Sequence, residues 1–405
     1  MKLDTSIPLN RVLSLPMMIF FGLGNILGAG IYVLIGKVAG HAAMFTPLSF
    51  LIAALAAVFT AFTYAELTSR YPVSAGAAVF VKEGFNLVPL SLIVGLLIIF
   101  TGTVSAATVA RGSVGYLQFF IDLPGGVLIF MVLAVLGGIA AWGVRESASL
   151  VAIVSAIEIF GLLFVIVAAG KVFADVPARM PEFIPGFEWS TFKGISAGAF
   201  LAFYAYLGYE DMANMAEEVN EPMRNLPYSI LASLMIATLL YMAVAAVSVL
   251  TLAPDILAQT DAPLAAVYKQ ATGSEPVLLS AVSVIAVING ALIQIIMAAR
   301  VCYGMSKRGW IPHIFGIVHP VTRTPIIATV IITLLVLIMA LWLPIETLAR
   351  STSSGILVIF ILVNLSLLRI KRKHPAQETT FTVPLWVPIT GFLISACFLF
   401  LQFAG

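Results

Sequence analysis

The chain has 405 residues, of which 10% are charged and 61% are hydrophobic. A soluble globular domain carries about 25% charged and about 45–50% apolar residues, so this composition excludes an ordinary water-soluble domain. The formal net charge of +2 is too small to predict a nucleic-acid partner, and two cysteines, Cys302 and Cys397, provide no disulfide framework. Long apolar runs recur along nearly the whole chain, which predicts an all-α polytopic membrane protein.

Eleven apolar runs are long enough to cross a lipid bilayer, which takes about 20 residues of helix. The longest connections, residues 173–193 and 253–275, are rich in Pro, Asp and Glu and are expected to form exposed turns or short surface helices. The predicted spans are residues 13–35, 45–69, 87–118, 125–144, 147–171, 195–215, 227–252, 276–305, 325–343, 347–369 and 384–403.

The Lys and Arg residues predict how these spans are oriented. Most of the 21 fall in alternate connections, on the same side as the N-terminus. Because short cytoplasmic loops hold the positive charge, the N-terminus is expected in the cytoplasm. With eleven spans the C-terminus is then expected outside, and the cytoplasmic (plasma) membrane is the predicted location.

The first span is unusually rich in glycine at its centre, where it reads Gly22-Leu-Gly-Asn-Ile-Leu-Gly-Ala-Gly30. A lipid-facing helix would carry Leu and Ile at these positions. We expect the helix to break there, since irregular backbone at membrane depth is tolerated where it lines a protein-buried cavity. The alternative is close helix–helix packing, because Gly24 and Gly28 have the four-residue spacing of packing glycines.

The fifth span contains an acidic residue, Glu158, within the segment Ser155-Ala-Ile-Glu-Ile-Phe-Gly161. No Lys or Arg lies near it in this span. An acidic residue inside a membrane is costly and indicates function by default. Its carboxyl group could carry a proton or ligate sodium, and the alternative is a permanently protonated structural acid.

The sixth span is the second one with an unusual centre, Ala202-Phe-Tyr-Ala-Tyr-Leu-Gly-Tyr-Glu210. It lies five spans after the first, and paired interrupted spans mark the binding site of inverted-repeat transporters. We therefore predict a single transporter domain over residues 1–405, with repeats at about 13–171 and 195–369 and an extra helix at about 384–403.

Motifs of other chemistries are missing from the sequence. It contains no HExxH, GxSxG, P-loop or CxxC pattern, and its four histidines fall in or near predicted loops. No enzyme activity, cofactor or metal site is therefore expected. A channel is the remaining rival, but a continuous polar stripe or a ring of charges is not visible.

Several segments, taken in order, resemble signatures of the amino acid, polyamine and organocation permeases. The first is the glycine-rich stretch from Gly22 to Tyr32. The others are Tyr64-Ala-Glu-Leu67 with Tyr71-Pro-Val-Ser-Ala-Gly76, Tyr206-Leu-Gly-Tyr-Glu210 leading into Ala216-Glu-Glu-Val-Asn-Glu-Pro-Met-Arg-Asn-Leu-Pro227, Arg300 through Pro312, and Phe381-Thr-Val-Pro384. Members usually have twelve spans, and this chain supports eleven. The resemblance implies a five-plus-five inverted-repeat core with broken helices 1 and 6.

The resemblance also implies a substrate site at the two broken helices. Backbone N–H groups of Gly28, Ala29 and Gly30 would hold the substrate carboxylate, and the positive dipole end of a half-helix supports this independently. Carbonyl groups around Asn25, Ile26 and Tyr204 would meet the α-ammonium group. The unwound part of helix 6 would comprise Tyr204, Ala205, Tyr206 and Gly208, with Tyr206 and Tyr204 as candidates for an aromatic lid or, alternatively, for core filling.

Further positions follow from the same resemblance. Gln294 falls where a member of the family has a tryptophan that contacts the substrate side chain, although an interhelical hydrogen bond is an equal alternative. Glu158 falls within a turn of a lysine found in many proton-coupled members, with Asn289 at the neighbouring position of the eighth span. Glu210 is a second candidate for protonation, placed nearer the inner surface.

These observations predict a secondary active amino acid transporter that works by alternating access, with a proton as the expected coupling ion. An uncharged pocket at Gln294 and Asn289 favours neutral L-amino acids. The alternatives are a cationic amino acid or polyamine carrier or exchanger, sodium-coupled uptake, and a channel. The expected partners are an amino acid, a proton or sodium ion, and the lipid bilayer.

Overall fold

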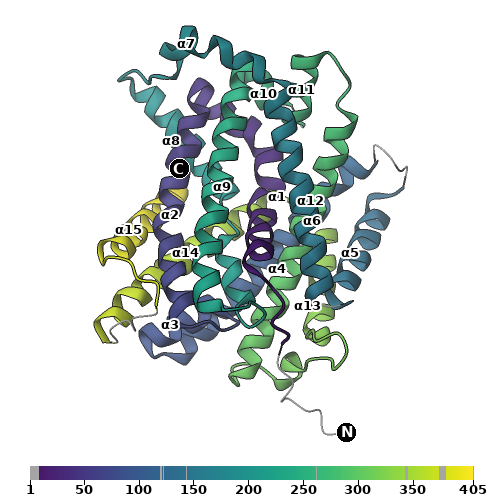
Figure 1. Ribbon diagram of the computed structural model, residues 1–405, viewed down its shortest axis with the longest axis vertical. Helices are drawn as coiled ribbons and strands as arrows, with labels where there is room; N and C mark the ends of the chain where they lie inside the picture. Colours follow the sequence, from purple (N-terminus) through teal and green to yellow (C-terminus); the bar gives the residue numbers. More distant parts are fainter. Residues whose placement is uncertain are drawn as a thin grey trace.

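The computed structural model describes residues 9–118, 121, 123–142, 144–260, 262–342, 345–373 and 380–404. These residues form α-helices and short 3-10 helices, and the β contact among them is an isolated bridge between Leu13 and Val219. Most of the long helices lie side by side along the long axis of the molecule (Figure 1). The all-α polytopic class is therefore confirmed.

Each of the eleven predicted spans contains one long helix. Among the described residues, seven helical stretches are long and apolar enough to cross a membrane, and three shorter helices are also apolar. In chain order the long helices are α1 (Leu15–Ala42), α2 (Thr46–Arg70), α4 (Val88–Gln118), α5 (Gly125–Trp142), α6 (Val144–Ala168), α8 (Trp189–Ala205), α9 (Pro222–Thr251), α12 (Val277–Lys307), α13 (Ile326–Trp342), α14 (Ile345–Lys373) and α15 (Trp386–Ala404).

The two longest connections contain short helices, as the Pro and acidic residues predicted. They lie together at the end of the molecule opposite the N-terminus (Figure 1) and are α7 (Val176–Arg179), α10 (Pro254–Gln259) and α11 (Pro263–Thr272). An additional helix, α3 (Gly76–Phe85), occupies a segment that the sequence analysis treated as a loop. Its apolar residues are buried, and it packs against α14 and α4, so tertiary packing stabilises this short helix.

The first span differs from the prediction. It forms one helix, α1, from Leu15 to Ala42, without the expected break between Gly22 and Gly30. Its glycines permit close packing instead, which the spacing also allowed. A Cβ atom on Gly22 would lie 2.5 Å from the sulfur of Met212, and one on Gly24 would collide with the hydroxyl of Ser155.

The sixth span is interrupted, as predicted. Its first helix, α8, ends at Ala205, and a 3-10 helix follows from Tyr209 to Met215. Between them Gly208 has a φ angle of 125°, a conformation that residues with a side chain rarely adopt. At the end of α8 the carbonyl of Tyr204 accepts a hydrogen bond from the amide of Leu207, and that of Ala205 accepts one from the hydroxyl of Tyr241 instead of from a following helical turn. Because α8 packs along α1, these groups lie next to the first span.

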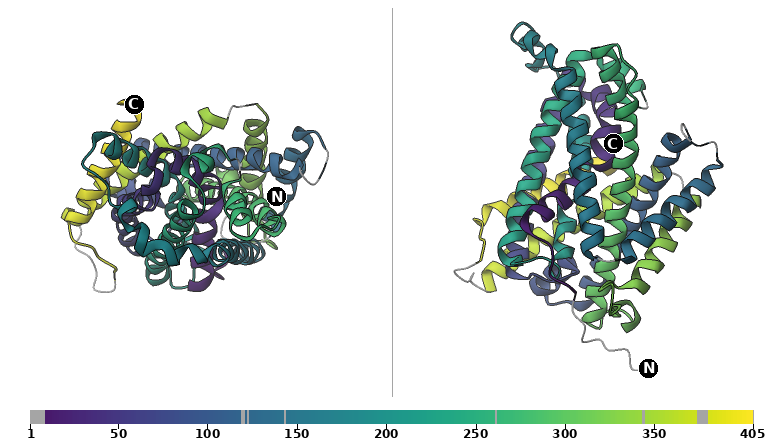
Figure 2. Two further views of the ribbon diagram at one scale, coloured as in Figure 1. Left: turned by 90° about the horizontal axis from the view of Figure 1, so that it is seen from above. Right: turned by 45° about the vertical axis from the view of Figure 1, so that its right-hand side comes forward.

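Helices that hold corresponding places in the two predicted repeats contact one another. α1 packs on α8, α2 on α9, α4 on α12 and α5 on α13. Figure 2 shows the last of these pairs at one side of the bundle, away from α2 and α15. In every pair the second helix comes five spans after the first.

A buried ion pair holds together the end of the molecule near the N-terminus. Arg300 of α12 lies 2.5 Å from Glu218, and the two side chains are 1% and 0% exposed. The backbone of Glu218 also accepts hydrogen bonds from the amides of Val12 and Leu13, and the amide of Asn220 donates to the carbonyl of Leu13. The segment before α1 is thus bound to the segment between the 3-10 helix and α9.

Candidate functional site

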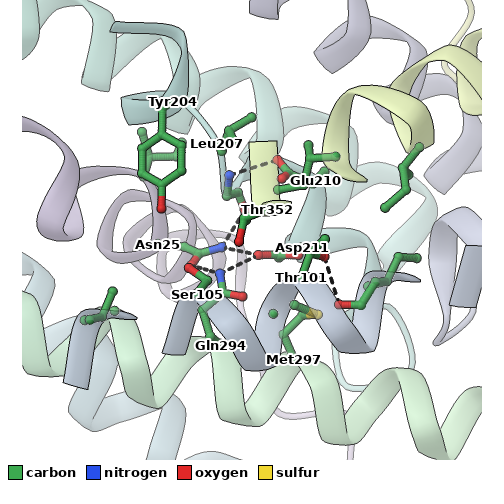
Figure 3. Close-up of a pocket in the computed structure, with 18 of the residues that line it drawn as sticks. Asn25, Thr101, Ser105, Tyr204, Leu207, Glu210, Asp211, Gln294, Met297 and Thr352 are labelled. Carbon is green, nitrogen blue, oxygen red and sulfur yellow. Dashed lines mark hydrogen bonds between the residues drawn. The ribbon is translucent and has the colours of Figure 1, made fainter. Parts of the chain in front are cut away.

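A pocket lies where α1 faces the interruption of the sixth span (Figure 3). Residues of α1, α4, α8, α12 and α14 border it, together with the segment after α8. Its polar lining comes from Asn25, Thr101, Ser105, Tyr204, Glu210, Asp211, Gln294 and Thr352, and its apolar lining includes Ile98, Met297, Ile356 and Ile359. Concave sites with an apolar wall and a few convergent polar groups are typical of small-molecule binding.

Three side chains of this pocket form a hydrogen-bonded group, which we call the carboxylate–amide cluster: Asn25, Asp211 and Gln294 (Figure 3). The amide nitrogen of Asn25 donates to Asp211 Oδ2 at 2.8 Å and to the carbonyl of Gly208 at 2.7 Å. The amide nitrogen of Gln294 donates to the same Asp211 oxygen at 2.9 Å and to Asn25 Oδ1 at 3.0 Å. The cluster therefore joins α1, α12 and the interrupted span.

Glu210, the neighbour of Asp211, also lines the pocket but is turned toward its own backbone. Its Oε2 atom accepts a hydrogen bond of 2.9 Å from the amide of Gly208. The carboxyl group thus satisfies a backbone donor that the interruption leaves without a helical partner. Glu210 lines the pocket at the interruption, and its depth relative to the inner surface stays a prediction.

Five acidic side chains are buried in the part of the chain that the structure describes. Two of them, Glu66 and Glu218, have Arg or Lys partners at 2.5–2.8 Å. The other three are Glu158, Glu210 and Asp211, and none of them has an ion-pair partner among the described residues. A buried carboxylate without a counter-charge is costly, so these three groups need a proton or an external cation.

Tyr241 of α9 joins the two central helices at residues that line the pocket. Its hydroxyl lies 2.6 Å from the carbonyl oxygen of Ile26 in α1 and 3.0 Å from that of Ala205 at the end of α8. The ring packs against Tyr206 and Phe50, with centroid distances of 5.1 and 5.5 Å. One buried hydroxyl therefore fixes the relative position of the helices that border the site.

We expect Tyr241→Phe to weaken both the fold and the site. The substitution keeps the ring but removes the hydroxyl that bonds to two buried carbonyl groups. We expect this loss to lower the free energy of unfolding by about 1–2 kcal/mol. Thermal unfolding of the purified protein measures the loss of stability. Tyr228→Phe is the matched control, because the side chain of Tyr228 is 55% exposed. An unchanged unfolding temperature in Tyr241→Phe would show that these bonds contribute nothing.

A second polar site lies on the other side of α1. Asn289 of α12 donates a hydrogen bond of 2.9 Å to Glu158 Oε1, and both residues are buried. The second carboxyl oxygen of Glu158 and the amide oxygen of Asn289 are buried without hydrogen-bond partners among the described residues. A Cβ atom on Gly24 would lie 2.8 Å from the amide nitrogen of Asn289. Gly24 thus contacts this site, whereas its neighbour Asn25 lines the pocket.

The structure brings most of the residues of the predicted substrate site together. Tyr206 is the exception: it is fully buried against aromatic neighbours, which agrees with core filling rather than a lid. Gly28, Ala29 and Gly30 belong to the part of α1 whose side chains lie outside the described ones. The predicted residues that line the pocket are Asn25, Ile26, Tyr204, Ala205, Gly208 and Gln294.

Asp211 is a site residue that the sequence analysis missed, as are Thr101, Ser105 and Thr352. The signal for Asp211 was available, since an acidic doublet begins two residues after the glycine of an interrupted apolar span. The preference for neutral substrates depended on a pocket whose polar groups, Gln294 and Asn289, carry no charge. The structure removes that premise, because two acids line the pocket and Asn289 instead bonds to Glu158. The substrate class therefore stays a prediction.

The chain was compared with known proteins. It is 31% identical to "Cationic amino acid transporter 3, mitochondrial" of Arabidopsis thaliana, over 91% of this chain and 64% of that protein. It is 28% identical to "Branched-chain amino acid permease BcaP" of Bacillus subtilis, over 93% of this chain and 84% of that protein. It is 29% identical to "Methylthioribose transporter" of Bacillus subtilis, over 96% of this chain and 87% of that protein. The chain thus spans less than two thirds of the length of the plant relative.

The family comparison covers nearly the whole chain. The sequence profile described as "Amino acid permease" matches residues 13–405. This range includes every helix that borders the pocket and both polar sites of α1. The chain belongs to the amino acid permease family.

Proposed function

We propose that the protein is a secondary active transporter of L-amino acids that works by alternating access and couples transport to protons. The observation that carries the proposal is the pocket at the interruption of the sixth span, where buried acids have no ion-pair partner among the residues that the structure describes. Irregular backbone at membrane depth lines cavities and ion or substrate pathways. Names of related proteins support the same class, since they are called amino acid transporters or permeases.

The proposed architecture is an inverted repeat of five plus five helices. It is supported by the contacts of α1 with α8, α2 with α9, α4 with α12 and α5 with α13. Substrate sites of such transporters lie between the repeats, near the middle of the membrane. The pocket lies between α1 and α8, which are the first helices of the two proposed repeats.

The substrate's α-ammonium group has an acceptor at the end of α8. The C-terminal end of a helix carries a partial negative charge. The carbonyl of Tyr204 accepts a hydrogen bond from the amide of Leu207 and that of Ala205 accepts one from the hydroxyl of Tyr241, and each carbonyl oxygen keeps a second lone pair for a substrate. Tyr204 and Ala205 of α8 line the pocket at this end. For the carboxylate, the backbone amides of Gly28 to Gly30 remain our prediction, but because α1 is continuous there they could bind it only in a conformation in which α1 unwinds.

Glu158 is the proposed coupling residue. Its carboxyl group is fully buried, bonds to Asn289, and has an oxygen without a partner among the described residues. Gly24 packs against this pair, and the next residue, Asn25, holds Asp211 in the pocket. Gain or loss of a proton at Glu158 therefore acts on the same turn of α1 that borders the substrate.

We expect Glu158→Gln to lose concentrative uptake and to retain exchange. The amide cannot release or accept the coupling proton, whereas exchange requires only that the loaded carrier reorients. The measurement is uptake of radiolabelled amino acids into proteoliposomes, with an imposed pH gradient and, in parallel, with unlabelled amino acid inside. Glu182→Gln is the matched control, because Glu182 is 44% exposed and pairs with Arg179 at the surface.

The possible outcomes separate the mechanisms. Uptake that requires sodium, and loses this requirement in Glu158→Gln, would assign the site to sodium instead of a proton. Concentrative uptake that Glu158→Gln leaves unchanged would make this residue structural and direct the search to Glu210. Flux that does not saturate and shows no exchange would indicate a channel.

The membrane and the orientation are also proposals. We place the protein in the cytoplasmic membrane with its N-terminus inside, on the basis of the Lys and Arg distribution. Related plant proteins carry names with mitochondrial, vacuolar or chloroplastic locations, so the membrane is not common to all relatives.

A further inference from the structure

We propose that Asp211 selects substrates with a second positive charge, so that the pocket takes L-lysine, L-arginine or L-ornithine in preference to neutral amino acids. This inference rests on the proposed amino acid transport and names the substrate class of the same pocket. It comes from the position of Asp211 relative to the end of α8 and to the cluster amides.

The first step concerns the number of negative groups in the pocket. The end of α8 is one acceptor, and it can serve the α-ammonium group of any amino acid. Asp211 is a second acceptor on a different element, because it lies beyond Gly208 in the 3-10 helix. No Lys or Arg is among the described residues that line the pocket. A substrate with one ammonium group would leave one of the two acceptors without a cation.

The second step distinguishes the two acids. Glu210 uses an oxygen to bind the amide of its own neighbour, Gly208, at 2.9 Å. Asp211 receives both of its side-chain hydrogen bonds at one oxygen, Oδ2, from Asn25 and Gln294. No hydrogen bond from the described residues reaches its Oδ1 atom. Asp211 is therefore held by the cluster with one oxygen available to the pocket, whereas Glu210 serves the backbone.

The third step concerns the walls of the pocket. Apolar side chains line it beside the cluster, including Ile98, Met297 and Ile359. A methylene stem with a charged end needs this combination, in which apolar contacts surround the stem and a carboxylate meets the head. Cationic amino acids have this structure. A neutral aliphatic side chain would bury Asp211 without a partner, which costs binding energy.

The test compares L-lysine with L-norleucine, which has the same linear stem but lacks the terminal ammonium group. Wild-type protein in proteoliposomes should exchange lysine with a higher affinity than norleucine. Asp211→Asn keeps the shape and removes the charge, so we expect its affinity for lysine to fall about 30-fold or more, as for a buried charge that loses its partner. Its affinity for norleucine should be unchanged or higher. Asp211→Glu should recover part of the preference for lysine.

Each result of this test either supports or overturns the inference. An equal loss of lysine and norleucine exchange in Asp211→Asn would overturn it, because Asp211 would then bind the common α-ammonium group. Wild-type exchange of norleucine with no preference for lysine would also overturn it while leaving the proposed function intact. Exchange of neither compound would overturn this inference, and exchange of none of the twenty L-amino acids would overturn the proposed function as well. Thermal unfolding shows whether Asp211→Asn is folded. If it is not, the same comparison of lysine and norleucine is made with Asp211→Ser, and the preference of the wild-type protein still tests the inference.

Discussion

Arg300→Ala should unfold at a markedly lower temperature than the wild-type protein. The substitution leaves the carboxyl group of Glu218 buried, with 0% exposure and without its cation. Breaking a buried ion pair in this way costs about 3–5 kcal/mol, because the remaining charge is neither solvated nor paired. This test does not require a transport assay, because the tryptophan fluorescence of the protein in detergent reports unfolding directly.

The double variant Arg300→Met, Glu218→Leu separates the ion pair from the packing around it. Replacing both charges with apolar side chains is often neutral or stabilising, so we expect most of the lost stability to return. Arg179→Ala is the control, because the ion pair of Arg179 with Glu182 lies at the surface. An Arg300→Ala protein as stable as the wild type would mean that Glu218 is protonated and needs no partner.

Gly208→Ala should abolish most of the transport activity. Gly208 has a φ angle of 125°, so an alanine there is strained, and its Cβ atom would lie 2.9 Å from the side chain of Asn25. The strain costs about 1–3 kcal/mol, and the displaced Asn25 also loses its bonds to the carbonyl of Gly208 and to Asp211. We expect amino acid exchange to fall about 30-fold or more, which corresponds to about 2 kcal/mol.

Gly273→Ala isolates the contribution of the backbone conformation. Gly273 also has a positive φ angle, 71°, but a Cβ atom there would meet no atom within 4 Å. The control should therefore show a small loss of stability and normal exchange, measured on the same proteoliposomes. Normal exchange by Gly208→Ala would contradict the proposed role of the interruption as part of the substrate site.

The sequence was sufficient to predict the long helices, because membrane-spanning runs have a strong compositional signal. It was less reliable for predicting where a helix is interrupted. Four glycines from Gly22 to Gly30 predicted irregular backbone, yet α1 is continuous, and Gly22 and Gly24 serve close packing. The same residue type has both uses, and the neighbouring helices decide between them. At Gly208 the interruption is present because the chain turns there with a positive φ angle.

The two polar sites beside α1 also differ in how far the sequence could predict them. The pairing of Glu158 with Asn289 could be predicted, since the fifth and eighth spans are neighbours in the expected fold. For Asp211 the acidic doublet after Gly208 could have indicated the site, but a carboxyl group beside Glu210 in the chain gives no sign of which of the two faces a cavity. That depends on the 3-10 geometry after Gly208, which turns Glu210 to the backbone and Asp211 to Asn25 and Gln294.

The backbone pairing of Leu13 with Val219 constrains how the molecule can change its shape. Leu13 lies two residues before the start of α1, and Val219 lies shortly before α9, so three hydrogen bonds tie the starts of these two helices together. Tyr241 ties the same helices again at the level of the pocket. Because the two attachment points are separated along the helices, we expect α1 and α9 to move together. A motion that opens the pocket toward the N-terminal end would then either carry α9 with α1 or detach the N-terminal segment first.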